Sequence, residues 1–261
     1  MYKMNLLFCF LLTFSSGVLR AQSLLEDLDG DGVTSIVAFG DSITSGVGDG
    51  ISVGEFIEVA GQFGGGYPSR VSNLLDVPVT NSGVPGEVAT SGGVDRFLRV
   101  ASTSSADIFI IMEGTNDAIF ETSTSVFRDA IQSMVNATVA LGKQPVVVTL
   151  IPPCCDRDGR QFFTNSYNQV LIDLAIENEI PLVDLETLWV NTCENQSECE
   201  LLNIPEGLHP NSRGYDLVAH AVMATLLGID LMVPGGAEEL ENALGLEEGT
   251  VFAQPQSNLG E

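Results

Sequence analysis

The stretch "TSIVAFGDSITSG", residues 34–46, decides the fold class and places the first candidate functional side chain. Its first half is a β-branched, apolar run that ends at Gly40, which is typical of a strand buried on both faces of a parallel sheet. Ser42 stands two residues past the end of this run. Functional residues of open parallel sheets lie beyond the carboxyl ends of the strands, so Ser42 is predicted to lie at that edge.

The same alternation of strand and helix patterns continues along the chain. Further buried strands are predicted over residues 77–83, 106–114, 144–153 and 181–188. Amphipathic helices are predicted over residues 67–76, 92–101, 125–142, 166–179 and 211–228. Continuous apolar strands separated by such helices indicate a parallel sheet that is covered on both faces. We therefore predict a flavodoxin-like three-layer α/β/α sandwich with a five-stranded parallel sheet.

The composition fits one large folded domain. The chain has 261 residues, of which 44% are hydrophobic, and this length suffices for one α/β domain with a sizeable core. Its 35 Asp and Glu against 10 Lys and Arg give a formal net charge of −25. Such an acidic surface repels phosphate backbones and anionic lipid headgroups, so we expect no nucleic-acid partner.

The first 21 residues have the pattern of a secretory signal peptide. Lys3 supplies a positive start, residues 6–14 an apolar core, and "GVLRAQS" a small-residue exit with cleavage predicted after Ala21. The alternative is an uncleaved membrane anchor, but the apolar run is shorter than the roughly 20 residues that a spanning helix needs. We expect a secreted or periplasmic protein with no stable membrane insertion after cleavage.

Two acidic segments flank the predicted domain of residues 35–232. Residues 22–34 form an acidic leader, and residues 233–261 form an acidic C-terminal tail. Residues 44–66 carry eight glycines, and we predict a mobile loop over the exit of the first strand.

The leader contains "DLDGDG" at residues 27–32, which resembles the opening of a calcium loop. A full EF-hand loop needs a Glu at its twelfth position, where Ala38 stands, so an EF-hand is excluded. A looser and weak calcium site remains open, and its candidate ligands are Asp27, Asp29 and Asp31. The alternative is a leader that simply ends in a turn. We expect no metal for catalysis.

Cys9 leaves with the predicted signal, and four cysteines remain: Cys154, Cys155, Cys193 and Cys199. An even number in an exported protein indicates disulfides. Because adjacent cysteines pair poorly, we expect bonds from the loop of the first two cysteines to the loop of the last two. A simple bond between Cys193 and Cys199 is the alternative. A zinc site is disfavoured, because paired Cys-x-x-Cys spacing is missing.

Polar residues follow the predicted strands in four short blocks, which share one edge of the sheet. These blocks are "GDS" at 40–42, "NSGVPG" at 81–86, "GTND" at 114–117 and "EGLHP" at 206–210. In this order they resemble blocks I, II, III and V of the SGNH hydrolases, also called GDSL-type esterases and lipases. The resemblance spans residues 39–210, which is nearly all of the predicted domain.

The resemblance implies a role for each of these residues. Ser42 would be the nucleophile, and His209 the general base that later acts as the acid. The oxyanion would be held by the backbone N–H groups of Ser42 and Gly86 and by the side-chain amide of Asn116. Gly86 is preferred over Gly83, because the family's oxyanion glycine lies five residues past the Asn of block II. No cofactor is implied.

Glu206 stands where the family pattern has Asp, three residues before the histidine. Glutamate can also orient a histidine, so we predict that Glu206 is the third member of the triad. The alternative is that a backbone carbonyl or another acid holds His209. Asp41 and Asp117 are interpreted as hydrogen-bond acceptors that shape loops, and Gly83 as a residue that lets the backbone turn.

Simpler interpretations compete at several positions. Ser42 could be only a helix N-cap, and Asn116 could only pin a turn. "GISVG" at 50–54 matches the nucleophile elbow of α/β-hydrolases around Ser52, but a glycine-rich segment precedes it where that elbow needs a strand. His220 lies inside a predicted helix and is interpreted as a packed helix residue.

The function implied by the resemblance is a secreted serine ester hydrolase that works through an acyl-serine intermediate on a small-molecule ester. The glycine-rich loop favours small or medium acyl esters, and lysophospholipids and thioesters are also substrates within the family. The alternatives are a carbohydrate acetylesterase on the same site and a non-catalytic binding protein on this fold.

Overall fold

The computed structural model describes residues 22–50, 65–155, 161–193 and 199–251. Within those ranges, five parallel strands form one sheet in the order β2-β1-β3-β4-β5. They are β1 (Ile36–Gly40), β2 (Val79–Gly83), β3 (Ile108–Met112), β4 (Gln144–Val148) and β5 (Leu182–Val183). The predicted five-stranded parallel sheet is confirmed.

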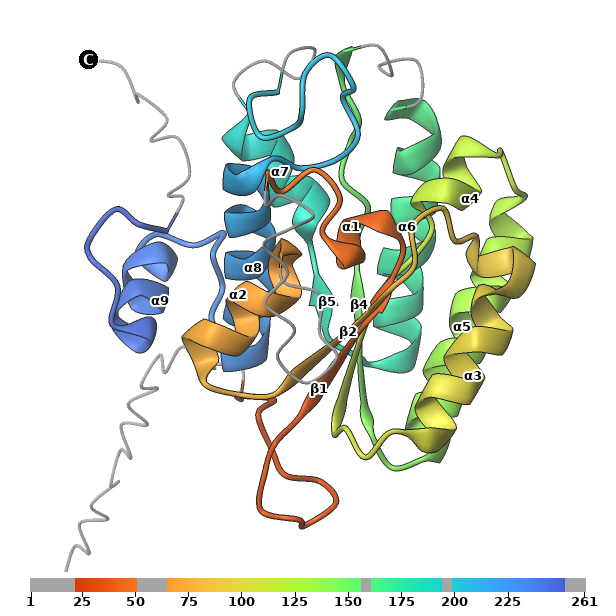
Figure 1. Ribbon diagram of the computed structural model, residues 1–261, viewed down its shortest axis with the longest axis horizontal. Coiled ribbons are helices and arrows are strands. Elements are labelled where there is room, and N and C mark those ends of the chain that lie inside the picture. The colour runs from red at the N-terminus through yellow and green to blue at the C-terminus, as the bar shows by residue number, and fades with distance from the viewer. Residues whose placement is uncertain (1–21, 51–64, 156–160, 194–198, 252–261) are drawn as a thin grey trace, which may run out of the picture.

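Helices connect the strands and cover both faces of the sheet (Figure 1). They are α1 (Ser42–Ser45), α2 (Gly66–Leu75), the π-helical turn η1 (Ala89–Gly93), α3 (Val94–Thr103), α4 (Thr115–Ile119), α5 (Thr124–Ala140), α6 (Gln161–Asn178), α7 (Leu185–Thr192), α8 (Ser212–Leu227) and α9 (Gly236–Leu244). The result is the predicted three-layer α/β/α sandwich.

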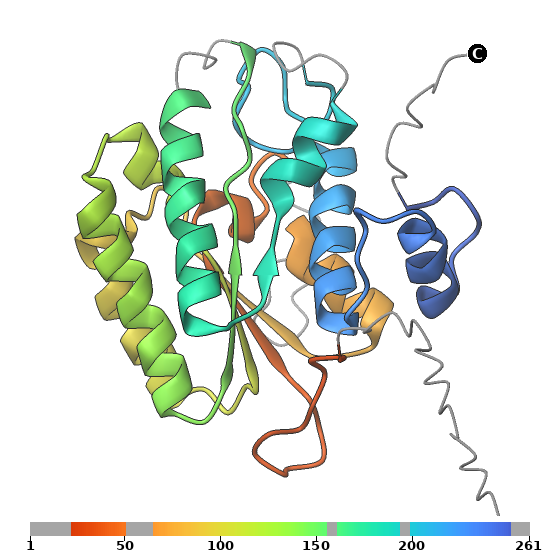
Figure 2. The same ribbon diagram turned by 180° about the vertical axis from the view of Figure 1, so that it is seen from behind.

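Side chains alternate along each strand, and this alternation builds two hydrophobic cores. In β1, Ile36 and Ala38 join the core under α2, α7 and α8, whereas Val37 and Phe39 join the core under α3, α5 and α6. All five residues of β1 are buried. Figure 2 shows the same two helical layers from behind. β1 is apolar at every position because both of its faces are covered by helices, as is usual for an interior strand of a parallel sheet.

The carboxyl ends of three adjacent strands, β2, β1 and β3, lie at the same edge of the sheet. Gly40 is in register with Gly83 of β2 and with Met112 of β3. The segments that follow these three strands therefore start side by side. This register is what brings blocks I, II and III of the sequence together.

The last strand is much shorter than predicted. The sequence indicated a strand over 181–188, but β5 ends at Val183 and α7 begins at Leu185. The carboxylate of Asp184 accepts a hydrogen bond from Thr187 N (3.1 Å) and so caps the helix. An N-cap that satisfies a free N–H group stabilises the helix over the strand, which the apolar pattern alone did not reveal.

The two flanking segments contact the domain. Leu24 N donates to Leu226 O of α8 (2.8 Å), and the Leu24 side chain packs against the α8-side core. The sequence-based prediction contained no helix after residue 232, whereas the structure has α9 there, with Leu240 fully buried. The helix α9 is amphipathic and covers part of the core that α8 also lines (Figure 1), but its many acidic side chains suggested a polar tail in the sequence.

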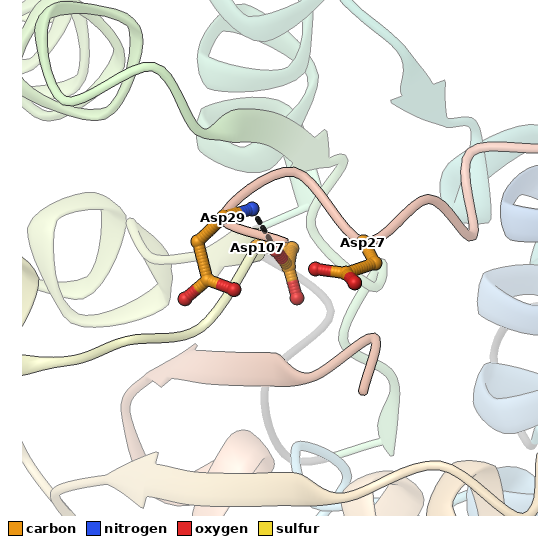
Figure 3. A group of neighbouring side chains, drawn as sticks. All are labelled: Asp27, Asp29 and Asp107. Carbon is orange, nitrogen blue, oxygen red and sulfur yellow. Dashed lines mark hydrogen bonds between the residues drawn. The ribbon is translucent and has the colours of Figure 1, made fainter. Parts of the chain in front are cut away.

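Asp107, which directly precedes β3, ties the leader to the sheet. Its carboxylate accepts hydrogen bonds from Leu28 N (2.8 Å), Asp29 N (3.2 Å) and Ser35 N (2.8 Å), and its side chain is buried. The bond from Asp29 is drawn in Figure 3. Three N–H groups share one charged acceptor, so Asp107 fixes the entry of the chain into β1.

Asp107→Ala is expected to lower the free energy of unfolding by about 2 kcal/mol or more, because three backbone N–H groups lose a charged acceptor. Urea denaturation measures this loss. Asp31→Ala is the matched control, since Asp31 is exposed and accepts from Val33 N (2.8 Å) in the same leader. The control is expected to change stability by less than about 0.5 kcal/mol. Equal losses for the two variants would contradict the anchoring role.

Candidate active site

Ser42 lies at the first position of α1, directly after β1. Asp41 caps this short helix by accepting from Ile43 N (2.8 Å), and the Ser42 side chain is nearly buried. The turn is tight at Gly40, where a Cβ atom would lie 2.1 Å from Thr44 Oγ1 and 2.4 Å from Met112 O. Only glycine fits there, so the chain passes from strand to helix in two residues and presents Ser42 at the sheet edge.

His209 comes to Ser42 from the loop before α8. Its Nε2 atom lies 2.9 Å from Ser42 Oγ, and its Nδ1 atom lies 3.1 Å from Glu206 Oε1. These three residues form one hydrogen-bonded chain in the order serine, histidine and carboxylate. That is the arrangement in which a histidine can take a proton from a hydroxyl while an acid fixes its tautomer.

Glu206 fits its position because its longer side chain folds back over its own loop. Its second oxygen, Oε2, accepts from Leu208 N (3.0 Å) and His209 N (2.9 Å). The intervening Gly207 has φ of +69°, and a Cβ there would lie 2.1 Å from Cys154 O. Of the two arrangements left open by the sequence, the structure places the Glu206 carboxylate at Nδ1.

The loop that carries His209 is tied to the loop that follows α1. The Asn203 side-chain amide donates to Gly48 O (2.9 Å) and Pro210 O (3.0 Å), and Asn203 N donates to His209 O (2.9 Å). Tyr215 of α8 adds a bond from its hydroxyl to Val47 O (2.7 Å). These bonds hold the histidine loop against the serine loop, although residues 203 and 209 are far from 47 and 48 in sequence.

The glycine-rich segment is described only at its ends. Its predicted mobile loop and Ser52, the centre of "GISVG", fall largely within residues 51–64, which lie outside the described residues. At the base, the carboxylate of Asp49 accepts from Gly66 N (2.6 Å) and from Arg70 (2.7 Å), so the two ends of the segment are joined.

Gly86 lies at the third position of a β-turn from Val84 to Glu87. Glu87 N donates to Val84 O (3.1 Å), Pro85 precedes the glycine, and Gly86 has φ of +79°, as type II turns require at that position. The hydrogen bond that closes the turn uses the Glu87 N–H group and leaves the Gly86 N–H group outside it. Gly86 is exposed at the sheet edge.

Gly83 has a packing role that differs from that of Gly86. A Cβ atom at Gly83 would lie 2.2 Å from Ser45 N and 2.7 Å from the carbonyl carbon of Thr44. The end of β2 therefore packs directly against α1, and only glycine permits this approach. Asn81 supports the same strand end, since its Oδ1 atom accepts from Gly83 N (3.0 Å).

Asn116 and Asp117 lie on α4, the short helix after β3. The Asn116 amide donates to Glu87 O (2.8 Å) and, at a longer 3.4 Å, to Asp41 Oδ2. The buried carboxylate of Asp117 accepts from Ala89 N (2.8 Å) and from the N–H and hydroxyl of Thr90. Asn116 therefore links all three strand-end loops, and Asp117 fixes the turn η1.

Sequence reasoning missed a group of buried acids beneath these loops. Glu113, the last residue before block III, is fully buried beside Asp41 and Glu87. Burial raises the pKa of Asp41 to about 6, and burial together with the neighbouring charges raises the pKa of Glu113 well above its usual range. Arg96 of α3 pairs with Glu87. The signal in the sequence was a Glu attached directly to the apolar run of β3.

Asp41→Asn is expected to flatten the pH dependence of stability. The folded state keeps the Asp41 proton between pH 3.8 and about 6, where the unfolded chain releases it, so the wild type loses stability as pH rises through this window. The shift corresponds to about 3 kcal/mol, and the Asn variant lacks this loss. Urea denaturation at pH 4 and pH 7.5 measures it. Identical pH slopes for both proteins would contradict the burial of this acid.

The disulfide pairing differs from the prediction. The structure joins Cys154 to Cys155 and Cys193 to Cys199, so the expected bonds between the two loops are wrong and the alternative bond is found. The chain turns sharply at Cys155, where φ is +61°, and this turn brings adjacent sulfur atoms together. The loop after β4 instead reaches the histidine loop through a backbone bond from Cys154 N to Gly207 O (2.8 Å).

The leader carboxylates predicted as calcium ligands lie near the amino ends of the strands, at the opposite end of the sheet from Ser42. Asp27 and Asp29 gather with Asp107, their carboxylate oxygens within 4.8 Å of one another, whereas Asp31 instead accepts from Val33 N (Figure 3). Each of these carboxylates already accepts backbone N–H groups, and those bonds suffice to hold the turn. Calcium binding stays a prediction.

His220 lies in the middle of α8 with its side chain buried, and burial lowers its pKa. It belongs to the packed helix face, as the sequence indicated.

Among the described ranges, none of the helices combines the length and apolar composition that crossing a bilayer requires.

Comparison with known proteins gives the chain its family. The sequence matches the GDSL-like Lipase/Acylhydrolase family over residues 38–217, and the chain belongs to that family. The resemblance drawn from the four blocks is thereby confirmed, and the protein is a carboxylic ester hydrolase. None of the curated proteins matches the sequence.

Several solved structures share the fold. A member of the lipolytic protein G-D-S-L family from Veillonella parvula is 22% identical, with 73% of this chain and 97% of that chain covered and a TM-score of 0.58. The lipase/acylhydrolase from Enterococcus faecalis is 23% identical, covering 75% and 96%, with a TM-score of 0.60. An acetyl xylan esterase from Geobacillus stearothermophilus is 21% identical, covering 74% and 94%, with a TM-score of 0.62. At these identities the likeness concerns the fold alone.

Proposed function

We propose that the protein hydrolyses small or medium acyl esters through an acyl intermediate on Ser42. The observation that carries the proposal is the hydrogen-bonded chain from Ser42 Oγ to His209 Nε2 (2.9 Å) and from His209 Nδ1 to Glu206 Oε1 (3.1 Å). A serine with a base in reach, and a base held by a third group, is the arrangement that activates a nucleophile. The presence of this complete hydrogen-bonded chain also argues against the alternative of a non-catalytic binding protein.

In the first half of the reaction, His209 removes the hydroxyl proton as Ser42 Oγ attacks the carbonyl carbon of the ester. The carboxylate of Glu206 keeps the proton of the neutral imidazole on Nδ1 and stabilises the imidazolium that forms. The tetrahedral intermediate then collapses, the ester C–O bond breaks, and His209 gives its proton to the leaving alcohol. The products of this half are the free alcohol and the acyl-serine.

In the second half, water takes the place of the alcohol. His209 removes a proton from the water as it attacks the acyl carbon, and then returns that proton to Ser42 Oγ as the carboxylic acid leaves. The enzyme recovers its starting state without a cofactor.

The oxyanion of both tetrahedral intermediates is assigned to the Ser42 and Gly86 N–H groups and the Asn116 amide. Ser42 N lies at the start of α1, where the free N–H groups of a helix favour negative charge. Gly86 N is free of the hydrogen bond that closes its turn. The Asn116 amide can turn from its 3.4 Å contact with Asp41 to the oxyanion while it keeps the bond to Glu87 O.

We further propose that the mature protein is exported. The support is the signal pattern of residues 1–21, which lie outside the described residues, together with two disulfides that are typical of oxidising compartments. A small-molecule ester is the expected partner of the mature protein.

A second candidate function is the removal of acetyl groups from carbohydrates. The observation in its favour is the shared fold with an acetyl xylan esterase, at 21% identity. The reacting groups would be the same, and only the alcohol side of the ester would differ.

One substrate series tests the proposal. Initial rates are measured on p-nitrophenyl esters of increasing acyl length and on acetylated xylan. We expect the highest kcat/KM on short or medium p-nitrophenyl esters. A clear preference for acetylated xylan would favour the carbohydrate acetylesterase, whereas a folded protein that hydrolyses none of these esters would contradict an esterase on this site.

A further inference from the structure

Arg96 lies on α3, outside the four sequence blocks, and its guanidinium reaches under the turn that carries Gly86. Arg96 Nε donates to Glu87 Oε1 (2.6 Å), and Nη2 donates to Glu87 Oε2. This is a two-pronged pair between a planar guanidinium and a carboxylate, which fixes orientation as well as distance. The Arg96 side chain is 19% exposed and the Glu87 side chain 9%, so the pair is largely shielded from water.

The same guanidinium also holds the ends of two strands. Arg96 Nη1 donates to Ser82 O (2.9 Å) on β2, and Nη2 donates to Gly40 O (3.2 Å) at the end of β1. The central carbon of the guanidinium lies 3.8 Å from the ring centroid of Phe39, so this ring also restricts the position of the guanidinium. One side chain therefore joins the carboxyl end of β1, the carboxyl end of β2 and the turn after β2.

Glu87 connects Arg96 to two of the candidate oxyanion donors, Gly86 and Asn116. It follows Gly86 directly, and its own N–H group closes the turn that presents Gly86. Its carbonyl oxygen accepts from the Asn116 amide (2.8 Å). Gly40, which Arg96 also holds, lies two residues before Ser42. Each of the three donors is therefore connected to the Arg96–Glu87 pair. Gly86 is adjacent to Glu87, Asn116 is hydrogen-bonded to it, and Ser42 lies two residues after Gly40.

The charge of Arg96 matters at this place. Asp41 and Glu113 are fully buried beside Glu87, and Arg96 Nη2 lies 4.0 Å from Glu113 Oε1. A cation among several carboxyl groups lowers the negative potential that an oxyanion would meet at this edge. A neutral replacement would lose both the hydrogen bonds and this compensation.

We propose that Arg96, through Glu87, is the positioning residue of the oxyanion hole. The inference rests on the proposed function, since it assigns a role at the same site. Donors that are fixed before the reaction stabilise the oxyanion without reorganisation, so a loosened hole should slow the chemical step and leave ground-state binding largely intact.

The test compares Arg96→Met with Arg99→Met, an exposed arginine one turn further along α3. For Arg96→Met we expect kcat on a p-nitrophenyl ester to fall by roughly 10²-fold, with KM within about threefold of the wild type. The inhibition constant of a trifluoromethyl ketone, which forms a tetrahedral oxyanion adduct on the serine, should rise by a similar factor. Arg99→Met should change neither quantity.

Arg96→Lys keeps the test decisive if the Met variant folds poorly. Lysine retains the charge but cannot make the planar two-pronged pair, so kcat should fall by about tenfold at a near-native melting temperature. A folded Arg96→Met or Arg96→Lys variant with kcat within threefold of the wild type would overturn the inference. This differs from a failure of the proposed function, in which the wild type itself would not turn over any ester.

Discussion

Ser42→Ala is expected to lower kcat/KM for a p-nitrophenyl ester by about 10⁵-fold, because the variant has no nucleophile for the acyl intermediate. The residual rate would come from the oxyanion donors alone. The fold should persist, since Ser42 contributes its side chain to His209 and not to the core. Initial rates and a melting curve of the same preparation measure both effects.

The matched variant for this experiment is Ser52→Ala. Ser52 is the centre of the competing elbow pattern at residues 50–54, which the described part of the chain does not include. We expect this variant to keep most of the wild-type rate. The reverse pattern, with an active Ser42→Ala and an inactive Ser52→Ala, would mean that the nucleophile has been assigned to the wrong serine.

Glu206→Gln is expected to lower kcat by roughly 10³- to 10⁴-fold. Glu206 Oε2 accepts two backbone N–H groups, from Leu208 and His209, and a glutamine must place its single oxygen there. Its NH₂ group then faces His209 Nδ1 and forces the proton of the imidazole onto Nε2. A histidine in that tautomer cannot accept the Ser42 proton, although the loop keeps its hydrogen bonds.

The control for Glu206→Gln is Glu206→Asp, which restores the residue usual in the family. It keeps a carboxylate for Nδ1, so we expect it to retain far more activity than the Gln variant, at a loss set by the shorter reach. Steady-state kinetics and urea denaturation of both variants separate catalysis from stability. A near-native kcat for Glu206→Gln would show that another group orients His209.

The central strands and the large helices could be predicted because their side chains report burial directly. β1 is apolar at every position and lies inside the sheet, between β2 and β3, and the predicted helices over 125–142 and 211–228 match α5 and α8 within two residues at each end. A helix start was expected near Ser42, where α1 begins, but α4 was missed, because a helix of five residues leaves no periodic pattern.

The sequence predicted the residues of the candidate site, but not the surrounding side chains that hold them in position. The four blocks named Ser42 and His209, and only three-dimensional contacts reveal that Arg96 holds the turn of Gly86. Arg96 lies in an amphipathic helix, where an arginine normally indicates a solvated face. The prediction of the disulfide pairing was wrong for a related reason. The backbone turn at Cys155 that permits neighbouring cysteines to pair has no signature in the spacing of the cysteines.

The most direct measurement is mass spectrometry of the protein after reaction with a serine-reactive phosphonate ester. One equivalent of the phosphonyl group is expected on the peptide that contains Ser42, together with complete loss of esterase activity, and Ser42→Ala should take up no label. Stoichiometric labelling at Ser52, or full activity after labelling at Ser42, would contradict the assignment of Ser42 as the nucleophile of an ester hydrolase.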